Sequence, residues 1–326
     1  MRILVTGAGS LIGQGVIQTI KKIKKNFYIV GTDYFNNAIG LHWVDKGFIL
    51  PDLLQSDKKK KLWEKKILKI IKKEKINLII PGLDFELEHL INLKNKIEKI
   101  SCKLLISNKD IITIFNDKWY TYNYLKKNNF FYPNTTLKKG LRRFLYKNKF
   151  PLIVKPRRGS TSKNVFLVKN LSELRKAIKI CPNPIIQEYL FANNNEYTCG
   201  TIMSEGNLLS SIVLKRRLKN GNTVQASYKN NNTTRKITNF IEKLTKKINP
   251  EGPLNLQLCY KNNKPIVFEI NPRFSGTTPL REIFGLNEIE TYINYLEKKK
   301  LRKFKQNFRE GTVLRYFDNF FVNKIL

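Results

Sequence analysis

Three polar side chains in the last third of the chain could together bind a divalent metal ion. Gln257 lies in one strand-like stretch, and Glu269 and Asn271 lie in the next, across a short Asn262-Asn263 turn. Because side chains alternate along a strand, Glu269 and Asn271 face the same way, and Gln257 could converge on them from the preceding strand. One carboxylate and two amide oxygens are hard ligands that suit Mg²⁺.

Arg273 is two residues beyond Asn271, so in an extended chain its side chain would face the same way as those of Glu269 and Asn271. A guanidinium group at this place could bind a transferred phosphoryl group through two parallel hydrogen bonds. A buried Glu–Arg pair that serves only the fold is the alternative. We favour the functional interpretation for this cluster.

A second segment has the residue types that hold nucleotide phosphates. The strand pattern over residues 151–155 ends at Lys155, and the small residues Gly159, Ser160, Thr161 and Ser162 follow it. The N–H groups and hydroxyls of such a loop can contact phosphates while the lysine neutralises their charge. The lysine precedes the loop, so this is not a Walker A motif, and a plain β-hairpin turn is the alternative.

Glycines at positions 7, 9 and 13 follow the first strand, and Asp33 follows the second. This pattern could bind a dinucleotide, with Asp33 on the ribose, as in an NAD(P)-dependent short-chain-type oxidoreductase. The fingerprint, however, requires its third glycine where Ile12 stands. We therefore prefer a tight, closely packed strand-to-helix turn and keep the oxidoreductase as the alternative function.

Composition excludes several classes of protein. The chain has 326 residues, of which 41% are hydrophobic, enough for a packed core. It has no apolar run long enough to span a membrane, and its four scattered cysteines and two histidines predict neither a disulfide framework nor a zinc site. A cytoplasmic location is expected.

The net charge of +36 has two interpretations. It could be a footprint for nucleic acid or another anionic surface. It could also reflect a coding bias, because lysine, asparagine and isoleucine are over-used together. We favour the bias, since the lysines are spread along the chain, and the run from Lys58 to Lys61 fits the exposed face of a helix that buries Trp63, Ile67, Ile70 and Ile71.

Two kinds of sheet are needed to position these residues. Strand patterns at residues 2–5, 27–30, 78–80 and 103–106 alternate with helical periodicity, which predicts a parallel sheet with helices on both faces, ending near residue 114. A helix is predicted over 117–129 and another over 171–180, with Ser172 in range to cap it. Strands at 151–155, 165–168, 185–188, 197–203, 208–214, 254–260 and 265–270 suggest antiparallel sheets.

Five segments, in this order and spacing, resemble the motifs of ATP-grasp ligases, in particular single-module relatives of the carbamoyl-phosphate synthase large subunit. They are Asn116-Asp117-Lys118, the Lys155 strand with its loop, Gln187-Glu188-Tyr189-Leu190, Glu196-Tyr197, and Glu269 to Arg273. The resemblance implies a Rossmann-like domain over residues 1–114, a small α+β lobe over 115–184, and a large lobe over 185–326 that holds the metal site and a C-terminal strand.

The resemblance also implies roles for individual residues. ATP would be bound by Lys118, Lys155, a mobile loop over Gly159, Ser160, Thr161 and Ser162, a hinge over Gln187, Glu188, Tyr189 and Leu190, and Glu196 on the ribose. Mg²⁺ or Mn²⁺ would be held by Gln257, Glu269 and Asn271. Arg273 and Lys155 would be catalytic. The substrate would meet Arg216, Gly276, Thr277, Thr278 and Arg281.

By the same resemblance, a substrate carboxylate would be activated as an acyl phosphate and attacked by an amine, with no specific nucleic acid or membrane partner. Such enzymes are often homodimers. The chain carries one module and no glutamine-hydrolysing segment, so carbamoyl-phosphate synthesis itself is not expected. Asp84 and Glu88 would share a helical face and could attract an amino group; acids favoured at a helix start are the alternative.

Overall fold

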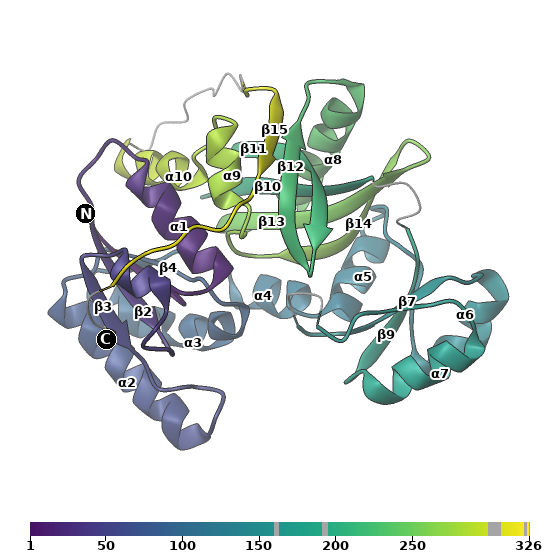
Figure 1. Ribbon diagram of the computed structural model, residues 1–326, viewed down its shortest axis with the longest axis horizontal. Helices are drawn as coiled ribbons and strands as arrows, with labels where there is room; N and C mark the ends of the chain where they lie inside the picture. The colour runs from purple at the N-terminus through teal and green to yellow at the C-terminus, as the bar shows by residue number, and fades with distance from the viewer. Residues whose placement is uncertain (160–162, 191–194, 299–307, 323–324, 326) are drawn as a thin grey trace.

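The computed structural model describes residues 1–159, 163–190, 195–298, 308–322 and 325. Figure 1 shows three regions: a parallel sheet near the N-terminus, a small lobe around β7 and β9, and a larger lobe around β10 to β14. No helix in these ranges is both long and apolar enough to cross a membrane.

The N-terminal sheet confirms the predicted parallel architecture. Its strand order is β3-β2-β1-β4-β5, and each of its pairs is parallel. The strands are β1 (Arg2–Thr6), β2 (Tyr28–Asp33), β3 (Lys46–Ile49), β4 (Leu78–Ile80) and β5 (Lys103–Leu104). The apolar strands β1 and β4 are buried on both faces, as strands of a parallel sheet must be. The strand β3 was not predicted.

Helices cover both faces of this sheet. One face packs on α2 (Asp57–Lys73) and α3 (Leu87–Glu98), and α2 buries Trp63, Ile67, Ile70 and Ile71 as predicted. The other face packs on α1 (Leu11–Lys21) and on residues of the distant helix α10 (Glu288–Lys298), with α9 (Thr278–Ile283) beside α1. The range 1–114 therefore contains the sheet but not all of the helices that cover it.

The small lobe is an antiparallel sheet of order β6-β9-β7-β8. Its strands are β6 (Thr135–Leu137), β7 (Leu152–Pro156), β8 (Phe166–Val168) and β9 (Pro184–Glu188), and its helices are α6 (Leu141–Lys147) and α7 (Leu171–Ile180). The strand β9 pairs with both β6 and β7, so this lobe extends past the boundary we placed at residue 184. The cap of α7 is Asn170, which accepts a hydrogen bond from the N–H of Glu173; the predicted cap Ser172 was wrong.

The large lobe is an antiparallel sheet of order β14-β13-β10-β11-β12-β15. Its strands are β10 (Glu196–Ser204), β11 (Asn207–Lys219), β12 (Asn222–Tyr228), β13 (Gly252–Lys261), β14 (Lys264–Asn271) and β15 (Gly311–Leu314). Asn262 and Asn263 both have positive φ, as a two-residue hairpin turn of the primed type requires. The strand β15 lies near the C-terminus, and β12 was not predicted.

Three helices pack on one face of this large sheet. They are α4 (Lys109–Phe115), α5 (Lys118–Lys127) and α8 (Asn232–Ile248), whose apolar residues share a core with β10, β13 and β14. The described chain also has short 3-10 helices at η1 (Ile39–His42), η2 (Asp84–Glu86) and η3 (Lys138–Gly140). The helix α5 replaces the predicted helix over 117–129, and α8 was not predicted.

Candidate active site

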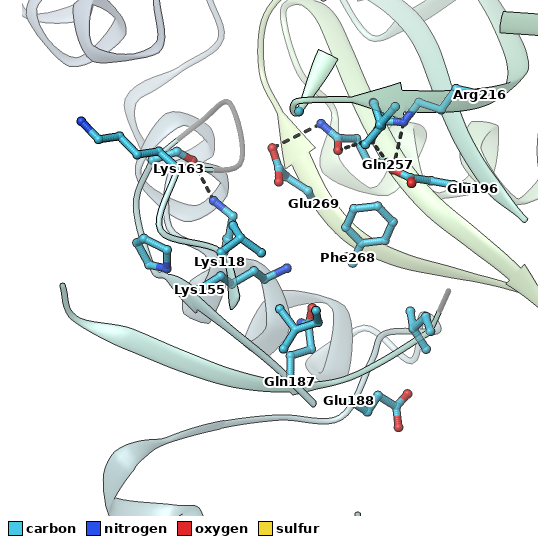
Figure 2. Close-up of a pocket in the computed structure, with 17 residues that line it drawn as sticks. Lys118, Lys155, Lys163, Gln187, Glu188, Glu196, Arg216, Gln257, Phe268 and Glu269 are labelled. Carbon is cyan, nitrogen blue, oxygen red and sulfur yellow. Dashed lines mark hydrogen bonds and ion pairs between the residues drawn. The ribbon is translucent and has the colours of Figure 1, made fainter. Parts of the chain in front are cut away.

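A cavity of about 300 Å³ lies between the small and the large lobe. Figure 2 shows its polar side chains reaching inward from both lobes. Ten of the residues that the sequence singled out line it: Lys118, Lys155, Gly159, Gln187, Glu188, Leu190, Glu196, Arg216, Gln257 and Glu269. The structure thus brings together side chains that are far apart in the sequence, from Lys118 to Glu269.

The two lysines are positioned by a connection between α5 and the end of β7. Asp117 caps α5 by accepting hydrogen bonds from the helix N–H groups, and it forms an ion pair of 2.8 Å with Arg157. The N–H of Lys118 donates to the carbonyl of Arg157 at 2.9 Å, and its Nζ donates to the carbonyl of Gly159 at 2.9 Å. These contacts hold Lys118 beside the loop that follows Lys155.

Lys155 is a buried lysine, with 6% of its surface exposed. Burial, and then the charge of Lys118, lower the pKa of its ammonium group to about 7. Its Nζ lies 5.5 Å from the centre of the Phe268 ring. Two neighbouring cations in a partly dehydrated cavity favour the binding of an anion.

The opposite wall of the cavity is built around Glu269. Asn271 Nδ2 and Gln257 Nε2 both donate to Glu269 Oε1, at 3.0 Å and 3.3 Å. Burial alone would raise the pKa of this carboxyl, but the charges of Lys118 and Lys155 and the Asn271 hydrogen bond hold it below its usual value. The three side chains therefore converge, and Glu269 carries a negative charge at neutral pH.

Phe268 is a cavity residue that the sequence did not reveal. In a regular strand it would point away from the face that carries Glu269. The register between β13 and β14 shifts here, because Gln257 pairs with Glu269 while Leu258 pairs with Val267. Phe268 is the extra residue of this bulge, and Figure 2 shows its ring in the cavity. No pattern in the sequence marks the bulge.

Arg216 forms the far wall together with Glu196. Its Nε and Nη2 donate to Glu196 Oε1 at 3.0 Å and 2.5 Å, and Nη2 also donates to Gln257 Oε1 at 2.6 Å. Glu196, which we expected on the ribose, and Arg216, which we expected near the substrate, thus form an ion pair with each other. Both assignments remain predictions.

The predicted hinge segment is partly inside the cavity. Gln187 is buried and its Nε2 donates to Thr135 Oγ1 at 2.9 Å, while Glu188 accepts a hydrogen bond from Asn134 Nδ2 at 2.9 Å. Leu190 lines the cavity, whereas Tyr189 is not among its lining residues. The predicted loop residues Ser160, Thr161 and Ser162 lie outside the described residues.

Arg273 lies away from the described wall of the cavity, with 8% of its surface exposed. Its Nε and Nη2 donate to the two carboxylate oxygens of Asp84 at 2.5 Å and 2.9 Å. Burial would lower the pKa of Arg273, but the charge of Asp84 raises it. Asp84 follows β4 at the carboxyl end of the parallel sheet, so the pair joins the large lobe to the N-terminal domain.

The other residues that we expected at the substrate are mostly internal. Arg281 and Glu288 form an ion pair of 2.9 Å with 1% and 0% of their side chains exposed, and Arg281 Nη2 donates to Asn255 at 2.7 Å. Thr277 and Thr278 are buried too. The expectation for Arg281 is corrected here, because its charge is compensated inside the fold and does not reach the cavity. Gly276 is half-buried, and its carbonyl accepts a hydrogen bond from Arg315.

The glycine-rich turn is packed by the protein itself. A Cβ atom on Gly13 would lie 2.1 Å from the carbonyl oxygen of Gly7, so close packing requires glycine there. Asp33 accepts hydrogen bonds from the N–H groups of Gly9 at 2.8 Å and Tyr34 at 2.7 Å. The acid expected on a dinucleotide ribose therefore holds the turn together, which favours the structural interpretation.

A parallel N-terminal sheet followed by two antiparallel lobes that enclose a cavity defines the ATP-grasp class of fold. Residues 115–277, half of the chain, match the model of the ATP-grasp domain, and residues 3–105 match that of the PylC-like N-terminal domain. The chain belongs to the ATP-grasp family. The resemblance and the fold class inferred from the sequence are confirmed.

Similar proteins include the carbamoyl phosphate synthase large chain of Saccharolobus islandicus, which is 24% identical over 229 residues. This match covers 66% of our chain, but the chain spans only 22% of the length of that relative. An uncharacterized protein of Mycoplasma genitalium is 25% identical over 199 residues, which are 56% of this chain and 66% of that protein.

Solved structures show the same fold at low sequence identity. The biotin carboxylase domain of 2-oxoglutarate carboxylase from Hydrogenobacter thermophilus, solved as a dimer with MgADP, ADP and bicarbonate, has a TM-score of 0.72 at 15% identity, over 95% of this chain and 73% of that one. The ADP complex of N5-carboxyaminoimidazole synthetase from Staphylococcus aureus has a TM-score of 0.70 at 16% identity, over 90% of this chain and 76% of that one. ATP and Mg²⁺ are the cofactors of this family.

Proposed function

We propose that the protein is an ATP- and Mg²⁺-dependent ligase that joins a carboxylate to an amine. The observation that carries this proposal is the convergence of Gln257, Glu269 and Asn271 opposite Lys118 and Lys155, across one cavity between the lobes. Basic side chains for phosphates and hard oxygen ligands for a metal are the two components that a Mg·ATP site needs.

The cavity suits ATP in charge and in polarity. Lys155 is buried with a depressed pKa beside Lys118, so an anion bound there relieves the repulsion between the two cations. Apolar side chains also line the cavity, among them Ile153, Leu190 and Phe268, and they provide a surface for a base. Phosphates would lie near the lysines, with the base against the apolar wall.

The metal would be held by the Glu269 carboxylate and the amide oxygens of Gln257 and Asn271. The same two amides now donate to Glu269, so both side chains already reach the carboxylate. No group of three or more His, Cys, Asp and Glu side chains in the described ranges could hold a metal, so the assignment depends on the amides. When bound, Mg²⁺ or Mn²⁺ would neutralise charge on phosphate oxygens.

In this reaction the protein would mainly position the reactants, and little covalent chemistry of its own would be needed. An oxygen of the substrate carboxylate attacks the γ-phosphorus of ATP, ADP leaves, and an acyl phosphate remains. An amine attacks its carbonyl carbon, phosphate leaves, and an amide forms. Lys155 would stabilise the transferred phosphoryl group, and Arg273 would stabilise the acyl phosphate from its place beside the N-terminal domain.

The substrates would be small molecules that enter where Asp84 and Arg273 meet. Ligands of open parallel sheets bind at the carboxyl ends of the strands, where Asp84 lies. Neither a specific nucleic acid nor a membrane is needed for this chemistry. A homodimer is part of the proposal, in line with the dimeric Hydrogenobacter domain.

The test is an ADP-release screen against carboxylic acids and amines, followed by mass spectrometry of the product. With the active pair, the carboxylate is then labelled with ¹⁸O in both oxygens. An acyl-phosphate route moves one labelled oxygen into inorganic phosphate. An amide product whose formation leaves all released phosphate unlabelled would refute the route.

A further inference from the structure

A second cavity, of about 570 Å³, lies on the other face of the strand that carries Arg216. The strand β11 contributes Arg216 and Leu218 to the first cavity and Lys215 and Arg217 to the second, and Arg216 borders both. Successive side chains of a strand point to opposite faces of the sheet. One strand therefore separates the cavity proposed for ATP from this second cavity.

The second cavity arises because β11 continues beyond the core under α8. On this face of β11, Val213 still packs with Ile237 and Ile241 of the helix. Two residues further along, the apolar side chain is replaced by Lys215, which is exposed. The neighbouring strands and the first turn of α8 complete a polar wall made of Tyr197, Gln225, Ser227, Thr233, Thr234 and Thr312.

The wall carries four cationic side chains, and only one of them is compensated by a carboxylate in the described residues. Its charged residues are Lys215, Arg216, Arg217 and Lys229, and it includes no carboxylate among the described residues. Arg216 is neutralised by Glu196 on the other face. The three remaining cations form no ion pair within the ranges that the structure describes. The first turn of α8 also holds no acid, so the positive end of the helix dipole adds to this potential.

The side chain of Thr234 is a second feature of this wall, distinct from its charges. Thr234 is 8% exposed, and its N–H donates to the cap residue Asn231 at 2.9 Å. Its hydroxyl, in contrast, has no hydrogen-bond partner in the described part of the chain, although the residue lines the cavity. This hydroxyl is not among the buried unpartnered hydroxyls of the described residues, which are those of Thr32 and Ser210, so it is accessible and can bond a guest.

We propose that this second cavity binds a small polyanion of the phosphate class, such as pyrophosphate or a phosphorylated metabolite. The cations Lys215, Arg217 and Lys229 compensate its charge, and the Thr234 hydroxyl donates to one of its oxygens. The recess has the size of a small ligand, and its described wall lacks the row of aromatic side chains on which the bases of a single strand stack. A phosphorylated small molecule fits it better than a nucleic acid does.

The test is a calorimetric titration of the full chain with pyrophosphate, in saturating non-hydrolysable ATP analogue and Mg²⁺ so that the first cavity is filled. Wild type should bind in a saturable manner. Arg217→Ala/Lys229→Ala should weaken the affinity at least about tenfold, since each lost phosphate contact to a charged group is a strong one. Thr234→Val, which keeps the shape of the side chain, should weaken it about threefold.

The matched control is Lys219→Ala/Lys236→Ala, which removes two exposed charges of β11 and α8 that do not line the cavity. It should bind pyrophosphate within about twofold of wild type. If both double variants lowered the affinity for pyrophosphate equally, the binding would depend only on the overall positive charge of the protein. That result would overturn the proposed site. No saturable binding by wild type, or tighter binding of a single-stranded oligonucleotide through the same residues, would overturn it as well. Repeating the titration without the ATP analogue separates this result from any failure of the ATP proposal.

Discussion

Arg273 and Asp84 form a forked ion pair that joins the end of β14 to the N-terminal domain, although 189 positions separate them in sequence. Arg273 is 8% exposed in its side chain and Asp84 is 22% exposed. A guanidinium group buried this deeply needs a partner, because removal from water strongly disfavours an isolated charge. The pair therefore ties the domain that would bring the substrate to the lobe that would bind the metal.

Replacing Asp84 by Asn should destabilise the protein. The change leaves the positive charge of Arg273 buried and without a counter-charge, which costs about 3 kcal/mol in the free energy of unfolding. Urea denaturation measures it. In an Arg273→Met background the same change should cost less than about 1 kcal/mol, because the orphaned charge is gone.

The control for this prediction is Glu98→Gln. Glu98 forms a surface pair of 3.8 Å with Lys94, and both side chains are substantially exposed. Its loss should change the free energy of unfolding by less than about 0.5 kcal/mol. If Asp84→Asn costs no more than this control, the pair does not join the two domains energetically.

The stability of the protein should depend on pH through Lys155. In the folded protein the pKa of this lysine is about 7. Its ordinary value is 10.5, which applies to the unfolded chain. Below pH 7 both states hold the proton, and the folded state bears the full cost of a buried charge. Between these two pKa values the folded state has released the proton while the unfolded state retains it, so stability rises with pH, by at most about 1.4 kcal/mol per unit.

Urea denaturation of wild type and Lys155→Met, from about pH 6.5 to about pH 9.5, isolates this effect. Groups other than Lys155 titrate in both proteins, so the difference between their free energies of unfolding reports on the lysine. Wild type should gain stability relative to the variant as the pH rises. A constant or falling difference would show that Lys155 keeps an ordinary pKa.

Gly13→Ala should destabilise the protein, although Ala normally stabilises a helix relative to Gly by up to about 1 kcal/mol. The sign reverses because the added Cβ would lie 2.1 Å from the carbonyl oxygen of Gly7. We expect a loss of about 2 kcal/mol. Gln18→Ala, at an exposed position of the same helix, should change stability by less than about 0.5 kcal/mol. A stabilised Gly13→Ala variant would contradict the packed turn.

The parts of the fold that follow local patterns could be predicted from the sequence. The buried run Ile3-Leu4-Val5 and the buried stripe of α2 can each be read from the spacing of apolar residues within one element. The shared face of Glu269 and Asn271 likewise follows from their spacing within one strand. The predicted convergence of Gln257 depends on more than the two-residue turn, because that turn alone would pair Gln257 with Phe268. The bulge at Phe268 pairs Gln257 with Glu269 instead, and the sequence does not mark it.

The parts that were missed depend on tertiary context. Phe268 enters the cavity through a bulge, and the β-strand β12 is half polar, so neither gives a periodic signal. Arg281 adjoins the site in sequence but turns into the core, where Glu288 meets it from the next helix. The pairing of Arg273 with Asp84 joins two domains, and no local pattern indicates such a contact.

The central claim is that Glu269 holds a metal ion beside ATP, and calorimetric titration with ATP tests it most directly. Wild type should bind ATP at least about tenfold more tightly with Mg²⁺ than with a chelator, and should not bind NADH. In Glu269→Gln the fold should persist, as circular dichroism can check, while the gain from Mg²⁺ disappears. Failure of wild type to bind ATP, or a gain from Mg²⁺ that Glu269→Gln retains in full, would contradict the account.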